Sequence, residues 1–188
     1  MKSNIQCFML DPTEEAQEEL RRYVCDVNSS CPLPHGYHDT SVEIGTCILS
    51  DSDINGRGSD DFDHSDSRWP ITCACGYLFQ PGDLWQHNTY RLYRRSDNGE
   101  LTTLKDAPVG AMWFAPWYLP VYKGPDGNCL VVKTPGGDWL LDGPTDKQRW
   151  TRTGVPPLVT ASPSILFYNK DHKPAYHGWL RNGRLEEC

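Results

Sequence analysis

The chain has 188 residues and a formal net charge of −7, from 18 lysines and arginines against 25 aspartates and glutamates. This length suits one domain with a real core, and seven Trp, nine Tyr and five Phe supply bulky apolar material, which excludes a chain disordered throughout. The acidic balance argues against a broad nucleic-acid-binding surface, because such surfaces are basic.

The first ten residues predict a short strand over residues 4–10 and contain no export signal, because their apolar stretch is too short and too polar. No apolar run approaches the roughly 18 residues that a membrane-spanning helix needs. We therefore expect a cytoplasmic protein that does not bind membranes. Its eight cysteines are then thiols and metal ligands rather than disulfides.

Residues 11–24 predict a helix. The motif Asp11-Pro12-Thr13-Glu14 offers an N-cap, a proline at the first helical position and an acid three residues after the cap. Glu18 and Arg22 then form an i,i+4 pair on the exposed side. The apolar residues recur at the spacing of one helical face: Ala16, Leu20, Tyr23 and Val24.

The rest of the chain predicts strands joined by hairpin turns. A strand pattern begins at Val42 and Ile44, and from Trp69 onward four turn motifs separate apolar runs. Asn-Gly and Gly-Gly favour tight hairpins, because these turns need positive φ angles. The motifs are Asp97-Asn98-Gly99 between 90–95 and 101–104, Pro125-Asp126-Gly127 between 117–122 and 130–133, Pro135-Gly136-Gly137 between 130–133 and 139–141, and Asn182-Gly183 between 176–180 and Leu185.

These elements predict a single α+β domain over residues 1–188. An N-terminal strand and helix in 1–28 pack on a hairpin-rich, mainly antiparallel β body in 29–188. Within that body, residues 50–67 form an exposed acidic loop. In this loop Asp51-Ser-Asp53-Ile-Asn55-Gly56 matches half of a calcium loop, but Phe62 stands where a bidentate glutamate belongs, so a solvated loop is the preferred interpretation.

The segment Cys73-Ala-Cys75-Gly76 is a compact metal-ligand turn that supplies half of a tetrahedral zinc site. Upstream, the loop at 31–38 offers a thiolate and two imidazoles. We predict a closed, structural Cys₃His zinc site that ties this loop to the β body: Cys31, His38, Cys73 and Cys75. The substitutes for any one ligand are Cys47, His35, His64 and His87.

An alternative reading of Cys73 and Cys75 stays open: residues i and i+2 of a strand share a face, so both thiols can simply pack inward. Four further cysteines have no ligand-like spacing and are expected to be core or surface thiols: Cys7, Cys25, Cys129 and Cys188.

Residues 110–118 are dense in aromatic side chains, which either fill a core or line a ligand groove at Trp113 and Trp117. His177 is a second, weaker candidate for ligand binding, although a lone histidine is more often a hydrogen-bonded structural residue. Ser162 and Ser164 are nucleophile candidates only if a base lies nearby. No hydrolase, phosphate-loop or dinucleotide motif is present, so no catalytic residue is named and the expectation leans away from an enzyme.

Several sequence blocks occur in a fixed order along the chain: 69–77, 92–95, 99–101, 107–113, 136–143, 150–154, 163–165 and 176–183. Together they resemble a family of uncharacterised proteins from actinobacteria and their phages, and the resemblance covers about residues 31–188. The relatives carry a Cys…Gly-x-His-Asp segment before the C-x-C-G turn, which supports Cys31 and His38 as ligands. The resemblance implies provenance and a shared fold, with no assigned activity.

The resulting hypothesis is a zinc-stabilised, non-enzymatic binding or accessory protein of phage or actinobacterial origin, acting in the cytoplasm on an unidentified protein or small-molecule partner. Three alternatives remain open at this stage. The first is a phage counter-defence factor that binds a host protein or a small signalling molecule, the second a metal-dependent hydrolase, and the third a minor virion component.

Overall fold

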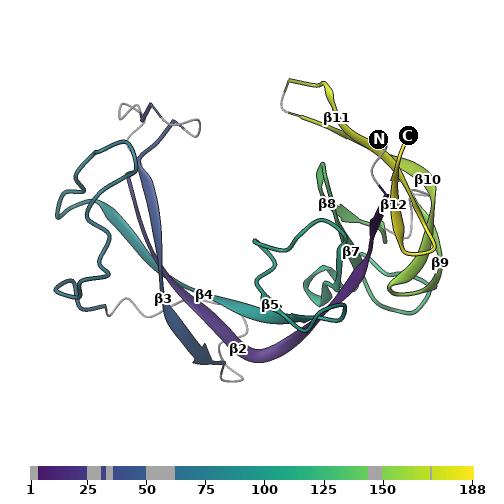
Figure 1. The fold of residues 1–188 in the computed structure, drawn as a ribbon, viewed down its shortest axis with the longest axis horizontal. Helices are drawn as coiled ribbons and strands as arrows, with labels where there is room; N and C mark the ends of the chain where they lie inside the picture. The colour runs from purple at the N-terminus through teal and green to yellow at the C-terminus, as the bar shows by residue number, and fades with distance from the viewer. Residues whose placement is uncertain (1–3, 25–30, 33–35, 50–61, 144–149, 170) are drawn as a thin grey trace. The chain divides into compact units, whose positions relative to one another are not determined.

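A computed structural model describes residues 4–24, 31–32, 36–49, 62–143, 150–169 and 171–188. The chain divides into two compact units: unit 1 comprises Met1–Asp11 and Tyr93–Cys188, and unit 2 comprises Pro12–Leu92. Two long strands, β2 (Phe8–Tyr23) and β4 (Leu84–Arg95), each contribute residues to both units (Figure 1).

The predicted N-terminal helix is wrong, and the α+β assignment with it. Residues 8–23 form strand β2, and the only helical segment within the described ranges is the short 3-10 turn η1 (Pro116–Tyr118). The spacing of four between Ala16, Leu20 and Val24 is also an even number, so it keeps one face of a strand as well as one face of a helix. The fold is almost entirely β.

Unit 1 contains a five-stranded antiparallel sheet in the order β1-β12-β11-β10-β9, in which Figure 1 shows β10, β11 and β12 side by side. The predicted hairpin at Asn182-Gly183 is confirmed: it joins β11 to β12, pairs Arg181 with Arg184, and has positive φ at both turn residues. The strands are β1 (Asn4–Gln6), β9 (Thr151–Val155), β10 (Leu158–Tyr168), β11 (Pro174–Arg181) and β12 (Arg184–Glu187).

The second sheet has the order β5-β4-β2-β6-β7-β8, with β3 also paired to β2. The hairpin predictions at 97–99 and 135–137 are confirmed, because these turns join β4 to β5 and β7 to β8. The expected strand at 117–122 is wrong: η1 lies there, and β7 pairs with β6 instead. The remaining strands are β3 (Asp39–Ile48), β5 (Leu101–Thr102), β6 (Ala111–Phe114), β7 (Leu130–Thr134) and β8 (Gly137–Leu140).

Strands β6 and β7 are buried on both faces, which explains their unbroken apolar sequences. Met112 and Val132 pack into one core cluster with Leu180 of the five-stranded sheet, whereas Trp113 and Val131 pack on the opposite face into a second cluster. Alternate residues of a strand point to opposite faces, so each strand serves both clusters.

Unit 1 also buries an ion network around Arg152. Its Nε donates to Asp142 Oδ1 at 2.8 Å, and its terminal nitrogen contacts Asp126 Oδ1 at 2.5 Å. The second oxygen of Asp142 accepts the Leu130 N–H at 2.8 Å. Arg152 and Asp142 are both almost fully buried, so each charge depends on the other for compensation.

In unit 2, β2 pairs with β3 in antiparallel register from Glu15↔Ile48 to Tyr23↔Asp39, which confirms the strand predicted from Val42 and Ile44. Pro12 lies between this ladder and the short parallel ladder of β2 with β6, so its missing N–H removes no hydrogen bond from either. The half-calcium motif at 51–56 lies outside the described residues.

Candidate metal centre and ligand cavity

The Cys73-Ala-Cys75-Gly76 motif forms the tip of a tight hairpin. Cys73 N–H donates to Tyr77 O at 2.9 Å, and Gly76 N–H donates to Cys73 O at 2.8 Å. Gly76 has φ +92°, a conformation that a residue with a side chain rarely adopts. The turn therefore projects two thiols one residue apart, as the sequence predicts.

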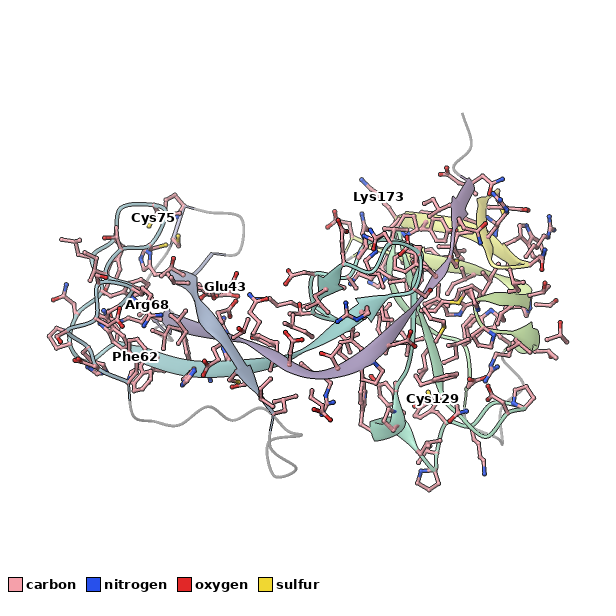
Figure 2. All side chains as sticks on the ribbon, turned by 60° about the horizontal axis from the view of Figure 1, so that its bottom comes forward. Glu43, Phe62, Arg68, Cys75, Cys129 and Lys173 are labelled. Atoms are coloured by element: carbon pink, nitrogen blue, oxygen red, sulfur yellow. The ribbon has the colours of Figure 1, made fainter. Side chains whose placement is uncertain are left out.

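The other two donors come from the segment that precedes β3. Cys31 N–H donates to Gly36 O at 3.2 Å, and Val24 N–H donates to His38 O at 3.0 Å, so the end of β2 and the start of β3 hold this segment. The donor atoms of Cys31, His38, Cys73 and Cys75 all lie within 4.8 Å of one another. The first three of these residues are buried, and Figure 2 labels Cys75 among neighbouring sulfur atoms.

The donor positions fit a tetrahedral metal ion. With metal–sulfur bonds of about 2.3 Å, the donors of such a site stand roughly 3.8 Å apart. Cys75 Sγ lies 3.2 Å from His38 Nδ1, and no pair exceeds 4.8 Å, so the site needs at most a small contraction around the ion. The His38 ring stacks on Tyr77 with centroids 4.0 Å apart, which fixes the orientation of the imidazole.

The site favours a thiolate at Cys73. Burial opposes ionisation there, but hydrogen bonds from the backbone of Cys75, from the His38 side chain and from the backbone of Asp39 outweigh it and lower the pKa of Cys73 to about 6. By contrast, burial raises the pKa of Cys7 to about 12 and that of Cys129 to about 11. The cluster thus differs chemically from the core thiols, since the thiolate is the metal-binding form.

We call the hairpin of residues 71–79, which carries Cys73 and Cys75, the metal hairpin. Arg22 binds both sides of its base, a role that the sequence pattern did not reveal. Its guanidinium donates to Pro70 O at 2.9 Å and to Gln80 O at 2.6 Å, on either side of the hairpin. The same group lies 5.0 Å from the ring centroids of both Trp69 and Phe79. The predicted exposed Glu18–Arg22 pair is wrong, because Arg22 is buried.

The substitute ligands proposed from sequence do not join the cluster within the described residues. Cys47 lies on β3, His64 stacks on Trp69 at 3.9 Å, and His87 Nε2 contacts Glu18 Oε1 at 3.0 Å. His35 lies outside the described residues.

A cavity of about 240 Å³ in unit 1 brings Trp113 and Trp117 together, as the groove hypothesis expected. Trp113 is almost fully buried, whereas Trp117 is 56% exposed. Lys133 and Asp138, on neighbouring strands, form an ion pair of 2.9 Å beside it. We call this the Trp113 cavity; its lining residues are Leu104, Lys105, Trp113, Trp117, Tyr118, Val131, Lys133, Asp138 and Leu140.

The polar lining of the Trp113 cavity was not anticipated. The sequence pattern assigns no function to Asp138, Lys105 or Lys133. The Lys133–Asp138 pair follows from the turn at 135–137, because a symmetric hairpin places residues 133 and 138 opposite each other. Lys105 and Tyr118 reach the cavity through non-local packing, for which no local sequence signal exists.

A second cavity of similar volume lies beside the first and shares Asp138 and Leu140 with it. Trp139 and Trp150 line this second cavity, and their indole nitrogens are buried without a hydrogen-bond partner among the described residues. Buried donors of this kind are usually satisfied by ordered water.

His177 does not line the Trp113 cavity. It is exposed on β11, and its Nε2 lies 3.2 Å from the Ser164 hydroxyl on β10. The structure therefore supplies a base near this serine, as a nucleophile would require. The pair lines neither described cavity, and the contact is read as a cross-strand hydrogen bond.

Comparisons of the chain with protein-family models, curated proteins and solved structures give no match. The resemblance to actinobacterial and phage proteins therefore stays a prediction. In the part of the chain that the structure describes, no helix combines the length and apolar character needed to cross a membrane.

Proposed function

We propose that this protein is a non-enzymatic binding protein that captures a ligand in the Trp113 cavity of unit 1, while a structural zinc ion holds unit 2. The observation that carries the binding role is the cavity itself, where a buried and an exposed tryptophan meet two lysines and an aspartate. Concave sites with apolar walls and a few polar groups are typical of small-molecule binding.

The surface beside the Trp113 cavity supports the same role. Exposed apolar side chains follow Trp113 along the chain, and two of them, Trp117 and Tyr118, line the cavity. Exposed apolar patches often mark binding surfaces. The residues are Phe114, Trp117, Tyr118, Leu119 and Val121.

Zinc is the ion that the cluster of Cys31, His38, Cys73 and Cys75 suits best. Three thiolates and an imidazole form a soft, four-coordinate donor set, which zinc favours and calcium or magnesium does not. Four protein donors leave no position for a reacting water, so the proposed role is structural. The donor set therefore weakens the alternative of a metal-dependent hydrolase.

The proposed setting is the cytoplasm of an actinobacterial cell, or of the host if the protein is phage-encoded. A reducing compartment keeps the cluster's thiols available for metal. A counter-defence factor that sequesters a small signalling molecule is the second candidate, and the Trp113 cavity favours it over a virion component because it offers a site for such a molecule.

Two measurements test the proposal. Elemental analysis of purified protein should find about one zinc per chain. Immobilised protein incubated with a bacterial small-molecule extract should retain a compound, identified by mass spectrometry, that the Trp117→Ala variant does not retain. Tyr168→Ala is the matched control, because Tyr168 is also 56% exposed and lies outside the cavity. Equal retention by both variants would remove the cavity as the binding site.

A further inference from the structure

We propose that the Trp113 cavity selects a small ligand that combines a planar aromatic ring with an acidic group, a carboxylate or a phosphate. The ring stacks against the tryptophan and tyrosine side chains, and the acidic group lies beside Lys105 and Lys133. This inference rests on the proposed function, since it names the ligand class for the same cavity.

The walls of the cavity suit a flat ring. Trp117 is 56% exposed and Tyr118 is 42% exposed, so both present ring surface that no described part of the chain covers. Tyr118 is held between Trp117 and Tyr122, with ring centroids 6.1 Å and 5.5 Å away. Aromatic side chains that are fixed beside a hollow stack readily on planar ligands.

The charges at the cavity select an anion. Two lysines and one aspartate line it, and a lysine that already has a protein partner can still donate to an acidic ligand group, because an ammonium group carries three N–H donors. Aromatic walls with a carboxylate also suit a quaternary ammonium ion. Lys105 and Lys133 oppose such a cation, and they supply the ammonium groups that bind carboxylates and phosphates.

Asp138 limits the affinity for an anion. Its Oδ1 lies 2.9 Å from Lys133 Nζ, so an incoming acidic group must share this lysine with the aspartate. The Asp138 side chain is 53% exposed, so neutralising it requires no repacking of a core. Neutralising Asp138 should therefore strengthen binding of an anionic ring, whereas neutralising Lys133 should weaken it.

The volume sets the size of the ligand. At about 240 Å³, the cavity is smaller than the roughly 300–1,000 Å³ that drug-sized ligands occupy. It accepts one ring system with its acidic group near the mouth. An aromatic carboxylic acid and a nucleoside monophosphate share this chemistry, and the probes below separate the two.

The test is isothermal titration calorimetry of the zinc-loaded, full-length protein against a fixed panel. The anionic probes are indole-3-acetate and the four common nucleoside monophosphates, the neutral probes are indole and adenosine, and the cationic probe is phenyltrimethylammonium. At least one anionic probe should bind about tenfold or more tightly than its neutral counterpart, and its affinity should fall with added salt. Indole-3-acetate alone would indicate a carboxylate ligand, and a nucleotide would indicate a phosphate ligand.

Two variants should change the affinity for the anionic probe in opposite directions, which a general loss of structure would not do. Lys133→Gln should weaken the anionic probe about tenfold, Asp138→Asn should strengthen it several-fold, and Lys173→Gln should leave it unchanged. Lys173 is an exposed lysine of unit 1 outside the cavity (Figure 2). Thermal unfolding of each variant checks that it folds.

Three results would overturn the ligand class: neutral probes that bind as tightly as anionic ones, preferential binding of the cation, or no binding by any probe. If the calorimetry gives one of these results but the wild-type protein still retains an extract compound that Trp117→Ala does not retain, the ligand class is wrong and the binding function stands. If both experiments fail, the proposed function fails as well.

Discussion

Replacing Cys75 by serine removes one of four metal donors while keeping the size of the side chain. Cys75 is only partly buried, so the change creates no large cavity. Its effect therefore reports on the metal rather than on packing. We expect the zinc content to fall below one per chain and unit 2 to lose stability.

Besides the Arg22 contacts at its base, a small apolar cluster is what orders the metal hairpin among the described residues. Fixing residues 71–79 costs about 1–2 kcal/mol per residue, or roughly 9–18 kcal/mol. The local core cluster fully buries only Phe79 beside two of the cysteines, and one buried Phe contributes about 1.5–3 kcal/mol. A structural zinc ion contributes about 10–16 kcal/mol, which is the scale required.

If the four donors contribute equally, Cys75→Ser removes about 2.5–4 kcal/mol of that stabilisation. In a unit of this size, 1 kcal/mol shifts the melting temperature by about 4–8 °C, so a shift of more than about 10 °C is expected. The assay is differential scanning calorimetry of wild type and variant, with and without a zinc chelator. The chelator should shift the wild-type transition and have little further effect on the variant.

Cys47→Ser is the matched control, because Cys47 belongs to unit 2 and lies outside the cluster. It should retain one zinc and an almost unchanged transition. The reasoning would be refuted by a Cys75→Ser variant that melts like the wild type, or by a wild-type protein that is well folded and indifferent to the chelator. Either result would show that the thiols of Cys73 and Cys75 simply pack.

Three further predictions concern the residues around these sites. Arg22→Lys should loosen the metal hairpin, because one ammonium group cannot bind the carbonyls of both Pro70 and Gln80 and also stack on two rings. The expected result is a lower zinc affinity in a competition titration. Arg68→Lys changes an exposed ion pair and should leave the zinc affinity unchanged. Asp142→Asn should destabilise unit 1 by about 3–5 kcal/mol in urea unfolding, because it leaves the buried Arg152 undercompensated; a loss below about 1 kcal/mol would contradict this account. Burial opposes ionisation of Asp126, but the Arg152 side chain and the Asn128 N–H outweigh it and hold the pKa of Asp126 below its ordinary value. Its contribution to stability is therefore complete above the ordinary pKa and is lost as pH falls through the lower folded value. Asp126→Asn should thus destabilise the protein at pH 7, and in matched urea titrations its difference from the wild type should shrink as pH falls below the ordinary pKa of the carboxyl group.

Turn chemistry made three of the four hairpins predictable from sequence. Asn98-Gly99, Gly136-Gly137 and Asn182-Gly183 lie where local backbone preference and hairpin geometry agree, and the strands beside them form as expected. The fourth motif does turn, with Gly127 N–H donating to Gly124 O at 3.0 Å, but the strand expected before it is η1. A turn motif reports the turn and not the partner strand.

The helix error at 11–24 has a different cause. Residues four apart lie on the same face of both a helix and a strand, so the apolar spacing alone does not separate the two. A helix is then favoured because a proline and acids at 11–14 are typical of a helix start. Those residues instead occupy the part of β2 between its ladders with β3 and β6, where Asp11, Pro12 and Glu14 are exposed, so a proline and acids are tolerated there. Glu19 and Arg22 show what the pattern missed, since both are buried polar residues on what is a strand.

The metal ligands were more predictable than the cavity. The spacing of Cys73 and Cys75 and the glycine that follows them identify both as candidate ligands from sequence. The structure places Cys31 and His38 beside them. The lining of the Trp113 cavity comes from η1, β6, β7, β8 and the segment after β5, which only the folded chain assembles. The Arg152 network depends equally on distant segments, and no local pattern marks it.

Unit 2 is a continuous segment placed between the two parts of unit 1. During synthesis, β1 must therefore wait for β12, almost at the other end of the chain, before its ladder from Asn4↔Glu186 to Gln6↔Arg184 can form. The four residues of the candidate metal cluster, by contrast, have all been synthesised once Cys75 has left the ribosome, and all of them belong to the segment that forms unit 2. The long-range pairing of unit 1 and the candidate metal cluster of unit 2 therefore become possible at different times during synthesis, although β2 and β4 contribute residues to both units.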